Sequence, residues 1–343
     1  MKIALIPPPL LKTPPSRYGG LEQVVFDLGC ALLKAGHEVT LIAPNGSKLP
    51  EPGVVIETGV AREDTKCNWI QEEIDHFGVY AARMDGFDII HDHTWFGTPY
   101  LAKVKKDIKI CHTHHGHLNW NPKMLPKKTP HLNLIAISQF MANLYTSMGF
   151  TSKYAYNGID LDRYPFKKEK GDRLLFVGRF SEFKMPHIAI DLARDAGHPI
   201  DLVGGTFVDN PNYLEYIKHR CSRGEASLHM DAPHEVKMEM MQNARALIVP
   251  SKFMEPFGLI AAEAMACGTP VVALNDGALR EVVGPDGVAG YVGNNYDEML
   301  RALNKVDGIS PVECRKRGEM FSRDIMASNY VTLYEKVIAG EEW

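Results

Sequence analysis

Two glutamates eight residues apart, Glu255 and Glu263, lie in the segment VPSKFMEPFGLIAAEAMACGTPVVAL. The spacing predicts a loop that carries the first acid, a helix that begins near Phe257 and Gly258, and Glu263 about one and a half turns into that helix. The free backbone amides from Phe257 to Leu259 should attract an anion. We therefore expect a long ligand, with hydroxyl groups on the carboxylates and phosphate on the amides. A capping box, the alternative, explains only one of the two acids.

A second polar stretch, FVGRFSEFKMPHIAI, places Arg179 and Lys184 between an apolar run and Pro186. Proline is favoured at the first position of a helix, so the two cations are expected on a loop between a strand and a helix. Two fixed cations there suit a diphosphate, whose charge must be neutralised as it departs. A solvated surface pair is the alternative for this stretch considered by itself.

Gly19 and Gly20 open a third candidate, the helical pattern GGLEQVVFDLGCALLKAG. A helix start with bare amides is a ready anion site. The segment lacks the G-x-G-x-x-G spacing and does not follow the first strand directly, which disfavours a dinucleotide. A simple turn explains the two glycines equally well when they are considered alone.

Histidines gather in HDH at 91–93 and in HTHHGH at 112–117. The second cluster differs by one residue from the H-x-H-x-D-H spacing of metallo-β-lactamase-type hydrolases, because Gly116 stands where an aspartate ligand is needed. That hydrolase fold is a β-sandwich, and the downstream candidate ligands here lie in the other half of the chain. We therefore expect no metal site, and we expect His112 and His117 to be buried or strand-end histidines bonded to backbone. A zinc hydrolase built on the His112 to His117 cluster remains the weaker alternative.

The composition is that of a globular protein of two domains: 343 residues, 45% hydrophobic, formal charge −4. The near-neutral balance gives no general electrostatic reason to bind nucleic acid. Six cysteines without a C-x-x-C pair indicate a reducing compartment, and we expect a cytoplasmic location. The prolines of MKIALIPPPLLK favour a first strand over a signal peptide, and no apolar run reaches the roughly 18 residues of a membrane span.

Short apolar runs rich in valine, isoleucine and leucine alternate with longer helical patterns, as in buried parallel sheets with crossover helices. The sequence predicts an α/β fold of two doubly wound, Rossmann-like domains, 1–155 and 166–320, which face each other across an inter-domain cleft. A final helical segment, 321–343, is expected to cross back to the first domain. Its apolar stripe consists of Ile325, Met326, Tyr330, Leu333 and Val337.

Ten strands are expected, five in each half of the chain. Ser138 should cap the helix that follows the fifth strand. The expected strands are 3–6, 39–43, 89–91, 108–113 and 134–137, then 174–177, 200–203, 228–230, 246–249 and 271–274.

Over nearly its whole length the chain closely resembles the retaining family 4 glycosyltransferases, also called glycosyl transferases group 1, which have the GT-B fold. The most specific match is Glu255-x7-Glu263, which resembles the donor-binding signature of the family. Supporting matches occur in the same order as in the family. They are GGLE at 19–22, HDH at 91–93, NGID at 157–160, VGR with Lys184, and GALREVV at 277–283.

The resemblance implies a role for each matching residue of the second domain. Arg179 and Lys184 would hold the donor diphosphate, and Glu263 the ribose. Glu255, with the amides of Phe257, Gly258 and Leu259, would hold the donor sugar. Met230 lies in the segment that packs the nucleotide base.

In the first domain, Gly19 and Gly20 would approach the phosphates and His115 would face the transferred sugar. Asn157 would lie near the hinge. The implied catalytic residues are His115, Arg179, Lys184 and Glu255.

The implied reaction moves a hexose-type sugar from a UDP-sugar or GDP-sugar to a hydroxyl of a sugar, a small molecule or a lipid-linked acceptor. An inverting transfer needs a general base and a double displacement needs a carboxylate nucleophile, and neither is evident in the sequence. The hypothesis is a front-face retaining transfer. In it the departing phosphate oxygen takes the acceptor proton while Arg179, Lys184 and helix amides stabilise its charge, without metal or cofactor.

Three departures from the family pattern leave the donor base and sugar open: Met185 after Lys184, Ala278 after Gly277, and Met230, each in place of a common glycine. A sugar-nucleotide epimerase or a phosphorylase on the same fold is the alternative function, and a non-catalytic sugar-nucleotide sensor is less favoured. Two basic stretches, 103–109 and 122–128, are interpreted as solvated faces. Weak peripheral contact with an anionic membrane is the alternative if the acceptor is a lipid.

Overall fold

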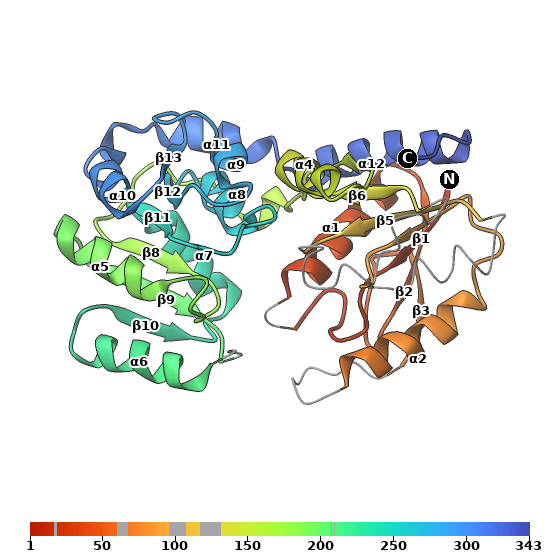
Figure 1. Ribbon diagram of the computed structural model, residues 1–343, viewed down its shortest axis with the longest axis horizontal. Helices are drawn as coiled ribbons and strands as arrows, with labels where there is room; N and C mark the ends of the chain where they lie inside the picture. The colour runs from red at the N-terminus through yellow and green to blue at the C-terminus, as the bar shows by residue number, and fades with distance from the viewer. Residues whose placement is uncertain (17–18, 60–67, 96–107, 117–131, 207, 209) are drawn as a thin grey trace. The chain divides into compact units, whose positions relative to one another are not determined.

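The computed structural model describes residues 1–16, 19–59, 68–95, 108–116, 132–206, 208 and 210–343 (Figure 1). The chain divides into an N-terminal unit, Met1–Gly158 with Arg323–Trp343, and a C-terminal unit, Ile159–Ser322. The divisions therefore fall after residues 158 and 322. Each unit is a parallel sheet with helices, which confirms the predicted α/β class.

The sheet of the N-terminal unit has the order β3-β2-β1-β4-β5-β6-β7, and all its strand pairs are parallel. Its central strands are buried along almost their whole length, as expected for a sheet covered on both faces. Because β4 pairs with β5, the HDH and HTHH stretches end at the same edge of the sheet. The strands are β1 (Lys2–Ile6), β2 (Glu38–Ala43), β3 (Val54–Glu57), β4 (Ile89–Asp92), β5 (Ile110–His114), β6 (Leu134–Ala136) and β7 (Lys153–Tyr154).

The described helices of this unit are α1 (Gly20–Lys34), α2 (Trp69–Ala81), α4 (Gln139–Ser147) and α12 (Arg323–Ile338). Ser138 caps α4 as predicted, since its side chain accepts a hydrogen bond from the Met141 amide at 3.1 Å. Helix α12, blue in Figure 1, packs on α1, β4 and β5 of the N-terminal unit. Four residues of its predicted stripe are buried, but Ile325 is 44% exposed, because it lies off the face that meets the sheet.

The sheet of the C-terminal unit has the order β10-β9-β8-β11-β12-β13 and is also parallel. All ten predicted strands are present with ends shifted by at most two residues, and β3, β7 and β13 were not predicted. Strand β7 has two residues and β13 begins and ends with glycine, so neither shows a clear apolar run. The strands are β8 (Leu174–Val177), β9 (Ile200–Gly204), β10 (Ser227–Met230), β11 (Ala246–Val249), β12 (Val271–Leu274) and β13 (Gly290–Gly293).

The helices of the C-terminal unit surround its sheet. They are α5 (Pro186–Ala196), α6 (Pro211–Ser222), α7 (His234–Asn243), α8 (Leu259–Ala266), α9 (Leu279–Val283), α10 (Tyr296–Leu303) and α11 (Pro311–Glu319), with short 3-10 turns η2 (Leu161–Arg163) and η3 (Val306–Gly308).

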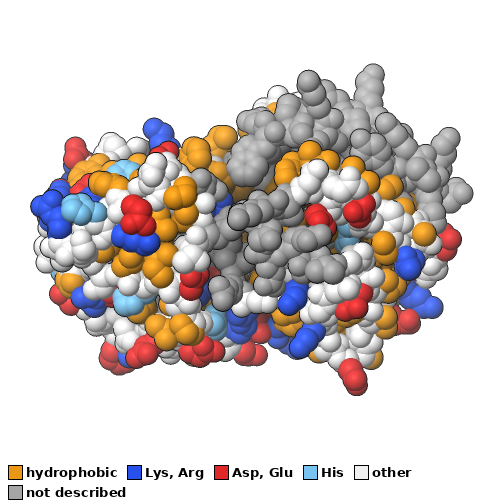
Figure 2. All heavy atoms as spheres, turned by 90° about the horizontal axis from the view of Figure 1, so that it is seen from below, with side chains coloured by type: hydrophobic (Ala, Val, Ile, Leu, Met, Phe, Trp, Pro, Cys, Tyr) orange, Lys and Arg blue, Asp and Glu red, His pale blue; other side chains and the backbone are white. Residues whose placement is uncertain are grey.

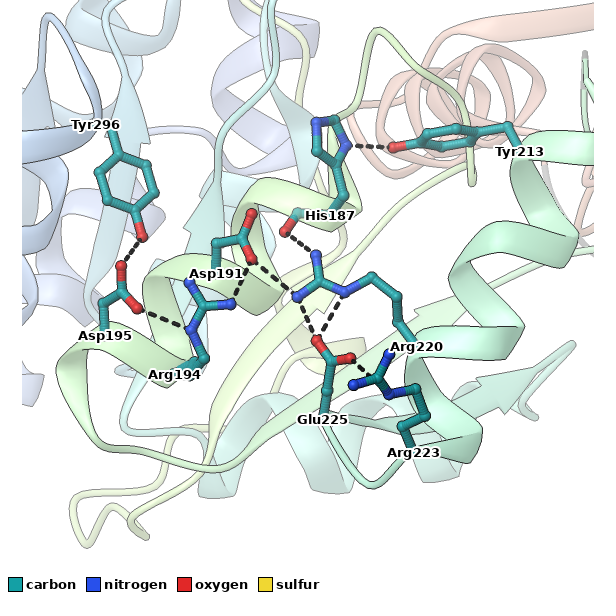
Figure 3. Close-up of polar contacts among 9 residues, drawn as sticks. All are labelled: His187, Asp191, Arg194, Asp195, Tyr213, Arg220, Arg223, Glu225 and Tyr296. Atoms are coloured by element: carbon teal, nitrogen blue, oxygen red, sulfur yellow. Dashed lines mark hydrogen bonds and ion pairs between the residues drawn. The ribbon is translucent and has the colours of Figure 1, made fainter.

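A buried arginine joins α5 to α6 (Figure 3). Arg220 of α6 is 8% exposed, and its guanidinium donates to the Asp191 carboxylate at 2.8 Å and to the main-chain oxygen of His187 at 3.3 Å. It also pairs with Glu225, which lies between α6 and β10. Since α5 begins directly after the loop that carries Arg179 and Lys184, this network anchors the helix that follows that loop.

Candidate active site

Glu255 lies on the loop between β11 and α8, and its side chain is buried. Its carboxylate accepts a hydrogen bond from the Ser251 hydroxyl at 2.7 Å and forms an ion pair with Lys184 of the β8–α5 loop. The Lys184 ammonium also lies 5.0 Å from the ring centroid of Phe253, within range of a cation–π contact. Two of the predicted site residues are therefore in direct contact, although the chain separates them by 71 residues.

The backbone around Glu255 depends on two glycines. Gly258 is the N-cap of α8 with φ 95° and has no side-chain cap, so the capping-box alternative is wrong. Gly277 has φ 66°, and a Cβ there would lie 2.3 Å from both the amide nitrogen and the carbonyl oxygen of Glu255. The Ala278 amide donates to that same carbonyl at 2.8 Å. The β12–α9 turn thus supports the Glu255 loop by backbone contact, which only glycine permits at residue 277.

Glu263 is the fifth residue of α8, at the predicted distance from the helix start. Its side chain is 14% exposed, and the Lys237 ammonium of α7 lies 3.6 Å from Oε2. That oxygen is buried and makes no hydrogen bond to the described residues. A ligand hydroxyl could satisfy it.

Arg179 and Lys184 lie on one short loop after β8. The Ser181 amide donates to the Arg179 carbonyl at 2.9 Å, and the Lys184 amide donates to the Ser181 carbonyl at 3.1 Å. Pro186 is the first residue of α5, as predicted. Met185, the N-cap of α5, has φ 54° and ψ 47°, the left-handed conformation that explains why the family commonly has glycine there.

Met230 is the last residue of β10 and pairs in register with Gly204 of β9. It is half-buried and packs against the core of the C-terminal unit. Its side chain is therefore near the carboxyl ends of these strands, the edge at which α/β sheets bind ligands.

In the N-terminal unit, α1 begins at Gly20 with Gly19 as its N-cap, as predicted. Sequence reasoning missed Glu22, which lies in the same helical turn. Its carboxyl oxygen is so near the helix start that a Cβ on Gly19 would lie 2.9 Å from it. Glu22 is buried, and this burial raises the pKa of its carboxyl to about 7, opposed by a hydrogen bond to its own backbone. The GGLE motif at 19–22, which ends at Glu22, was the sequence signal that could have identified this residue.

The predicted environment of His112 is wrong in one respect. The side chain is fully buried, but its Nδ1 lies 3.2 Å from the Asp92 carboxylate rather than on backbone. Asp92 also accepts hydrogen bonds from the amide and the hydroxyl of Thr94, at 3.1 and 3.0 Å. His112 bonds to Asp92 instead of to backbone because Asp92 is the last residue of the neighbouring strand β4. His117 lies outside the described residues.

His115 and His93 form a pair at the carboxyl edge of this sheet. His93 Nδ1 lies 2.9 Å from His115 Nε2. Burial, with a smaller contribution from His112, lowers the pKa of His115 to about 3, and burial also places the pKa of His93 well below its usual value. Both rings are therefore neutral at pH 7. In the described part of the chain, no group of three or more His, Cys, Asp or Glu side chains is arranged to hold a metal ion.

Behind this pair, His91 is held by α12. His91 Nδ1 lies 2.6 Å from the Tyr334 hydroxyl, and its Nε2 lies 2.7 Å from the Thr113 hydroxyl. Thr113 in turn lies 3.1 Å from the hydroxyl of Tyr330. The carboxyl end of β4 is thus braced by two tyrosines from a helix more than 200 residues later in the chain.

The predicted site residues therefore lie in two groups, one in each unit. Asn157 is buried beside the division of the units, and its Oδ1 has no hydrogen-bond partner in the described residues. Residues 103–107 and 122–128 of the basic stretches lie outside the described residues. On the face drawn in Figure 2, acidic and basic side chains are interspersed over the described surface. No helix among the described residues is long and apolar enough to cross a membrane.

Comparison with known families and proteins covers most of the chain. Residues 160–310 match the family model of glycosyl transferases group 1, and residues 18–163 match that of glycosyltransferase family 4. A D-inositol 3-phosphate glycosyltransferase of Xylanimonas cellulosilytica is 27% identical, over 84% of each chain. The O-antigen chain mannosyltransferase C of Escherichia coli is 24% identical, over 95% of this chain and 97% of its own.

Solved structures give the same result for the fold. AviGT4, a glycosyltransferase involved in avilamycin A biosynthesis, is 25% identical with a TM-score of 0.77, over 100% of this chain and 99% of its own. HepE of Anabaena, solved with UDP-glucose, is 16% identical with a TM-score of 0.72, over 98% of this chain and 100% of its own.

The fold and the matches define a glycosyltransferase of the GT-B class, built from two Rossmann-like domains. Within that class, the chain belongs to the family 4 glycosyltransferases, with the group 1 model matching its C-terminal unit.

Proposed function

We propose that this enzyme transfers a hexose-type sugar from a UDP-sugar or GDP-sugar to an acceptor hydroxyl, with retention of anomeric configuration and without a metal ion. The acceptor is a sugar, a small molecule or a lipid-linked hydroxyl. The observation that carries the proposal is the contact between Lys184 and Glu255 beside the start of α8, where a cation, a carboxylate and helix amides occur together. A sugar diphosphate needs these three kinds of group.

Within the C-terminal unit, different side chains bind the phosphates, the ribose and the sugar of the donor. The Lys184 ammonium has three N–H donors, so it can keep its bond to Glu255 and also bind a phosphate oxygen. Arg179 on the same loop supplies a second cation. Glu263 Oε2, which makes no hydrogen bond to the described residues, accepts a hydrogen bond from a ribose hydroxyl. The Glu255 carboxylate accepts hydrogen bonds from hydroxyl groups of the sugar. His115 and the start of α1, in the N-terminal unit, complete the proposed set.

In the proposed step, the bond between the anomeric carbon and the diphosphate oxygen breaks as the acceptor oxygen bonds to the same face of that carbon. The acceptor proton passes to the departing phosphate oxygen, so the products are a glycoside and a protonated nucleoside diphosphate. Arg179, Lys184 and the α8 amides stabilise the charge that grows on the leaving group. His115 is neutral at pH 7, which suits a hydrogen bond to the sugar rather than charge neutralisation.

The relatives agree with a nucleotide-sugar donor. HepE was solved with UDP, with UDP and glucose, and with UDP-glucose, and starch synthase IV of Arabidopsis thaliana with ADP and acarbose. A thermal-shift screen of UDP, GDP, ADP and their sugars identifies the donor of this enzyme. We expect one base to stabilise the protein, and incubation without acceptor to leave the donor unepimerised. Epimerisation of the donor would favour the alternative function.

Turnover then tests the mechanism. Arg179→Ala and Lys184→Ala should each lower kcat by orders of magnitude. The control is Lys218→Ala, which removes an exposed lysine paired with Glu215 and should keep the wild-type kcat. Proton NMR of the product should give the anomeric coupling of the donor. Wild-type rates in both cation variants, complete loss of activity in EDTA, or inversion at the anomeric carbon would each contradict the proposal.

We also propose a cytoplasmic location. Cys111, Cys221, Cys267 and Cys314 carry free thiols, which agrees with a reducing compartment. Cell fractionation followed by an activity assay tests this, and recovery of the enzyme in the extracellular or periplasmic fraction would contradict it.

A further inference from the structure

His93 lies between two other imidazoles at the end of β4. It is 2% exposed, its ring centroid lies 3.9 Å from that of His91, and its Nδ1 lies 2.9 Å from Nε2 of His115. Its other nitrogen, Nε2, is buried and makes no hydrogen bond to the described residues. Because a neutral imidazole carries one proton, this arrangement constrains where the protons of both rings reside.

Two tautomer assignments are compatible with one hydrogen bond between neutral rings. If His115 donated from Nε2, the proton of His93 would be on its own Nε2, as a buried N–H without a partner. Such a buried donor has lost its hydrogen bonds to water and gained none in return, which destabilises the folded state. If His93 donates from Nδ1, its Nε2 is only a bare acceptor, and buried acceptors without partners are tolerated better than buried donors. The second assignment is favoured, and it places the proton of His115 on Nδ1.

We propose that His93 is a positioning residue that donates a hydrogen bond to His115 and thereby fixes the tautomer in which His115 presents an Nδ1–H to the transferred sugar. This inference rests on the proposed role of His115 at the sugar. It makes His115 a hydrogen-bond donor to a sugar oxygen and not a base. It therefore agrees with a transfer in which the leaving group, and not a side chain, takes the acceptor proton.

The surroundings hold His93 in place for this purpose. The ring packs on His91, which is itself fixed on both nitrogens by Tyr334 and Thr113. Burial also lowers the pKa of His91 and of His93 well below the usual value, so neither ring gains a proton that would reverse the bond to His115 at pH 7. A donor held rigidly by a second row of side chains maintains the geometry of the group that meets the substrate.

Substitution of His93 by the two amides separates the two nitrogens of its ring. In His93→Asn the amide nitrogen can replace Nδ1 and donate to His115, whereas in His93→Gln it replaces Nε2 and the bond to His115 is lost. We expect His93→Asn to stay within about threefold of the wild-type kcat, and His93→Gln and His93→Phe to fall by about 10-fold to 100-fold, the scale of a misplaced catalytic group. Equal losses in the Asn and Gln variants would overturn the proposal.

His76 provides the matched control for removal of a buried histidine. It is also 2% exposed, and its ring is bonded to the Thr58 hydroxyl and the Pro7 carbonyl at 2.7 and 3.0 Å, outside the histidine pair. His76→Phe should lower the melting temperature and retain kcat. In a His115→Ala background, His93→Gln should cause no further loss of kcat, because the group that it positions is absent. A full additional loss would identify His93 as a general structural residue.

The tautomer can also be observed directly in the folded wild-type protein. The 15N shifts of histidine-labelled enzyme, assigned by comparison with His115→Ala, should show His115 protonated on Nδ1, and protonation on Nε2 would overturn the inference. Failure of the proposed function has a different signature. Wild-type turnover in His115→Ala would refute the role of His115 at the sugar, whatever tautomer it adopts. A low rate in His115→Ala with full activity in His93→Gln would refute only the role of His93.

Discussion

Lys184 and Glu255 form an ion pair that joins the β8–α5 loop to the β11–α8 loop, and the Ser251 hydroxyl donates to the same carboxylate oxygen at 2.7 Å. The pair is mostly shielded from water, with 26% and 9% of the two side chains exposed. Removal of one partner leaves the other as a poorly solvated, unpaired charge. Neutralising both partners leaves no unpaired charge and should therefore destabilise the protein less. The pair therefore connects the stability of the C-terminal unit to its proposed chemistry.

A double-mutant cycle separates these two roles. We expect Lys184→Ala to lower the free energy of unfolding by about 1–3 kcal/mol, because the Glu255 charge remains buried. Addition of Glu255→Gln should restore much of this stability but none of the turnover. Urea unfolding and kcat at saturating donor give the two measurements. If the double variant regained turnover, the pair would be structural only.

Gly277 should tolerate no side chain. In Gly277→Ala the new Cβ meets the backbone of Glu255 at 2.3 Å, so we expect a loss of about 2–4 kcal/mol and a marked fall in kcat as the Glu255 loop moves. Gly197→Ala is the control, because residue 197 has φ 76° and no atom of the described chain lies within 4 Å of the added Cβ. It should cost about 1–2 kcal/mol from conformation alone and retain kcat. Equal effects on kcat would contradict the contact argument.

Met185 has a left-handed backbone conformation that glycine adopts without strain. Met185→Gly and Met185→Ala both remove the thioether, so their difference measures the conformational cost. We expect the glycine variant to be the more stable of the two by about 1 kcal/mol in urea unfolding. An alanine variant of equal or greater stability would show that the residue leaves this conformation when the methionine side chain is absent.

Glu22 should make stability depend on pH. Its pKa is about 7 in the folded protein and about 4.5 in the unfolded chain, so the folded state binds the proton more tightly. The contribution of Glu22 to stability therefore falls as the pH rises from 4.5 through 7, by on the order of 3 kcal/mol, and levels off about one pH unit above the folded pKa. Glu22→Gln should be more stable than the wild type at pH 8 and similar to it at pH 4.5.

The control for this comparison is Glu298→Gln, because hydrogen bonds to the Asn294 amide lower the pKa of Glu298 instead of raising it. Urea unfolding at the two pH values provides the measurement. If Glu22→Gln differed from the wild type equally at both pH values, a titrating carboxyl would not be the cause.

Much of the fold followed from local patterns. The buried strands β8, β11 and β12 have the predicted bounds because an apolar run of four residues between turns has few alternatives in an α/β chain. Short or exposed strands were missed, since β3 is only partly buried and β7 has two residues. Their place in the sheet comes from pairing with a neighbouring strand, which a single segment does not reveal.

The candidate site likewise has features that local spacing predicted and contacts that it did not. Motif spacing placed Glu263 on α8, Pro186 at the start of α5 and Gly20 at the start of α1, because helix starts have strong local signals. The partners of the candidate residues were not predictable from spacing. Glu22 beside the start of α1 and Asp92 beside His112 became evident only when the backbone had placed them together.

The sequence by itself determined the family, the two parallel α/β sheets and which residues approach the ends of their strands, because these depend on local periodicity and on motifs of neighbouring residues. Only the tertiary structure decided that Lys184 meets Glu255, that Gly277 supports the Glu255 loop, and that His93 faces His115. Such contacts join residues far apart in the chain, and they depend on strand order and on packing between elements. In a parallel sheet, neighbours in space are set by the crossovers and not by distance along the chain.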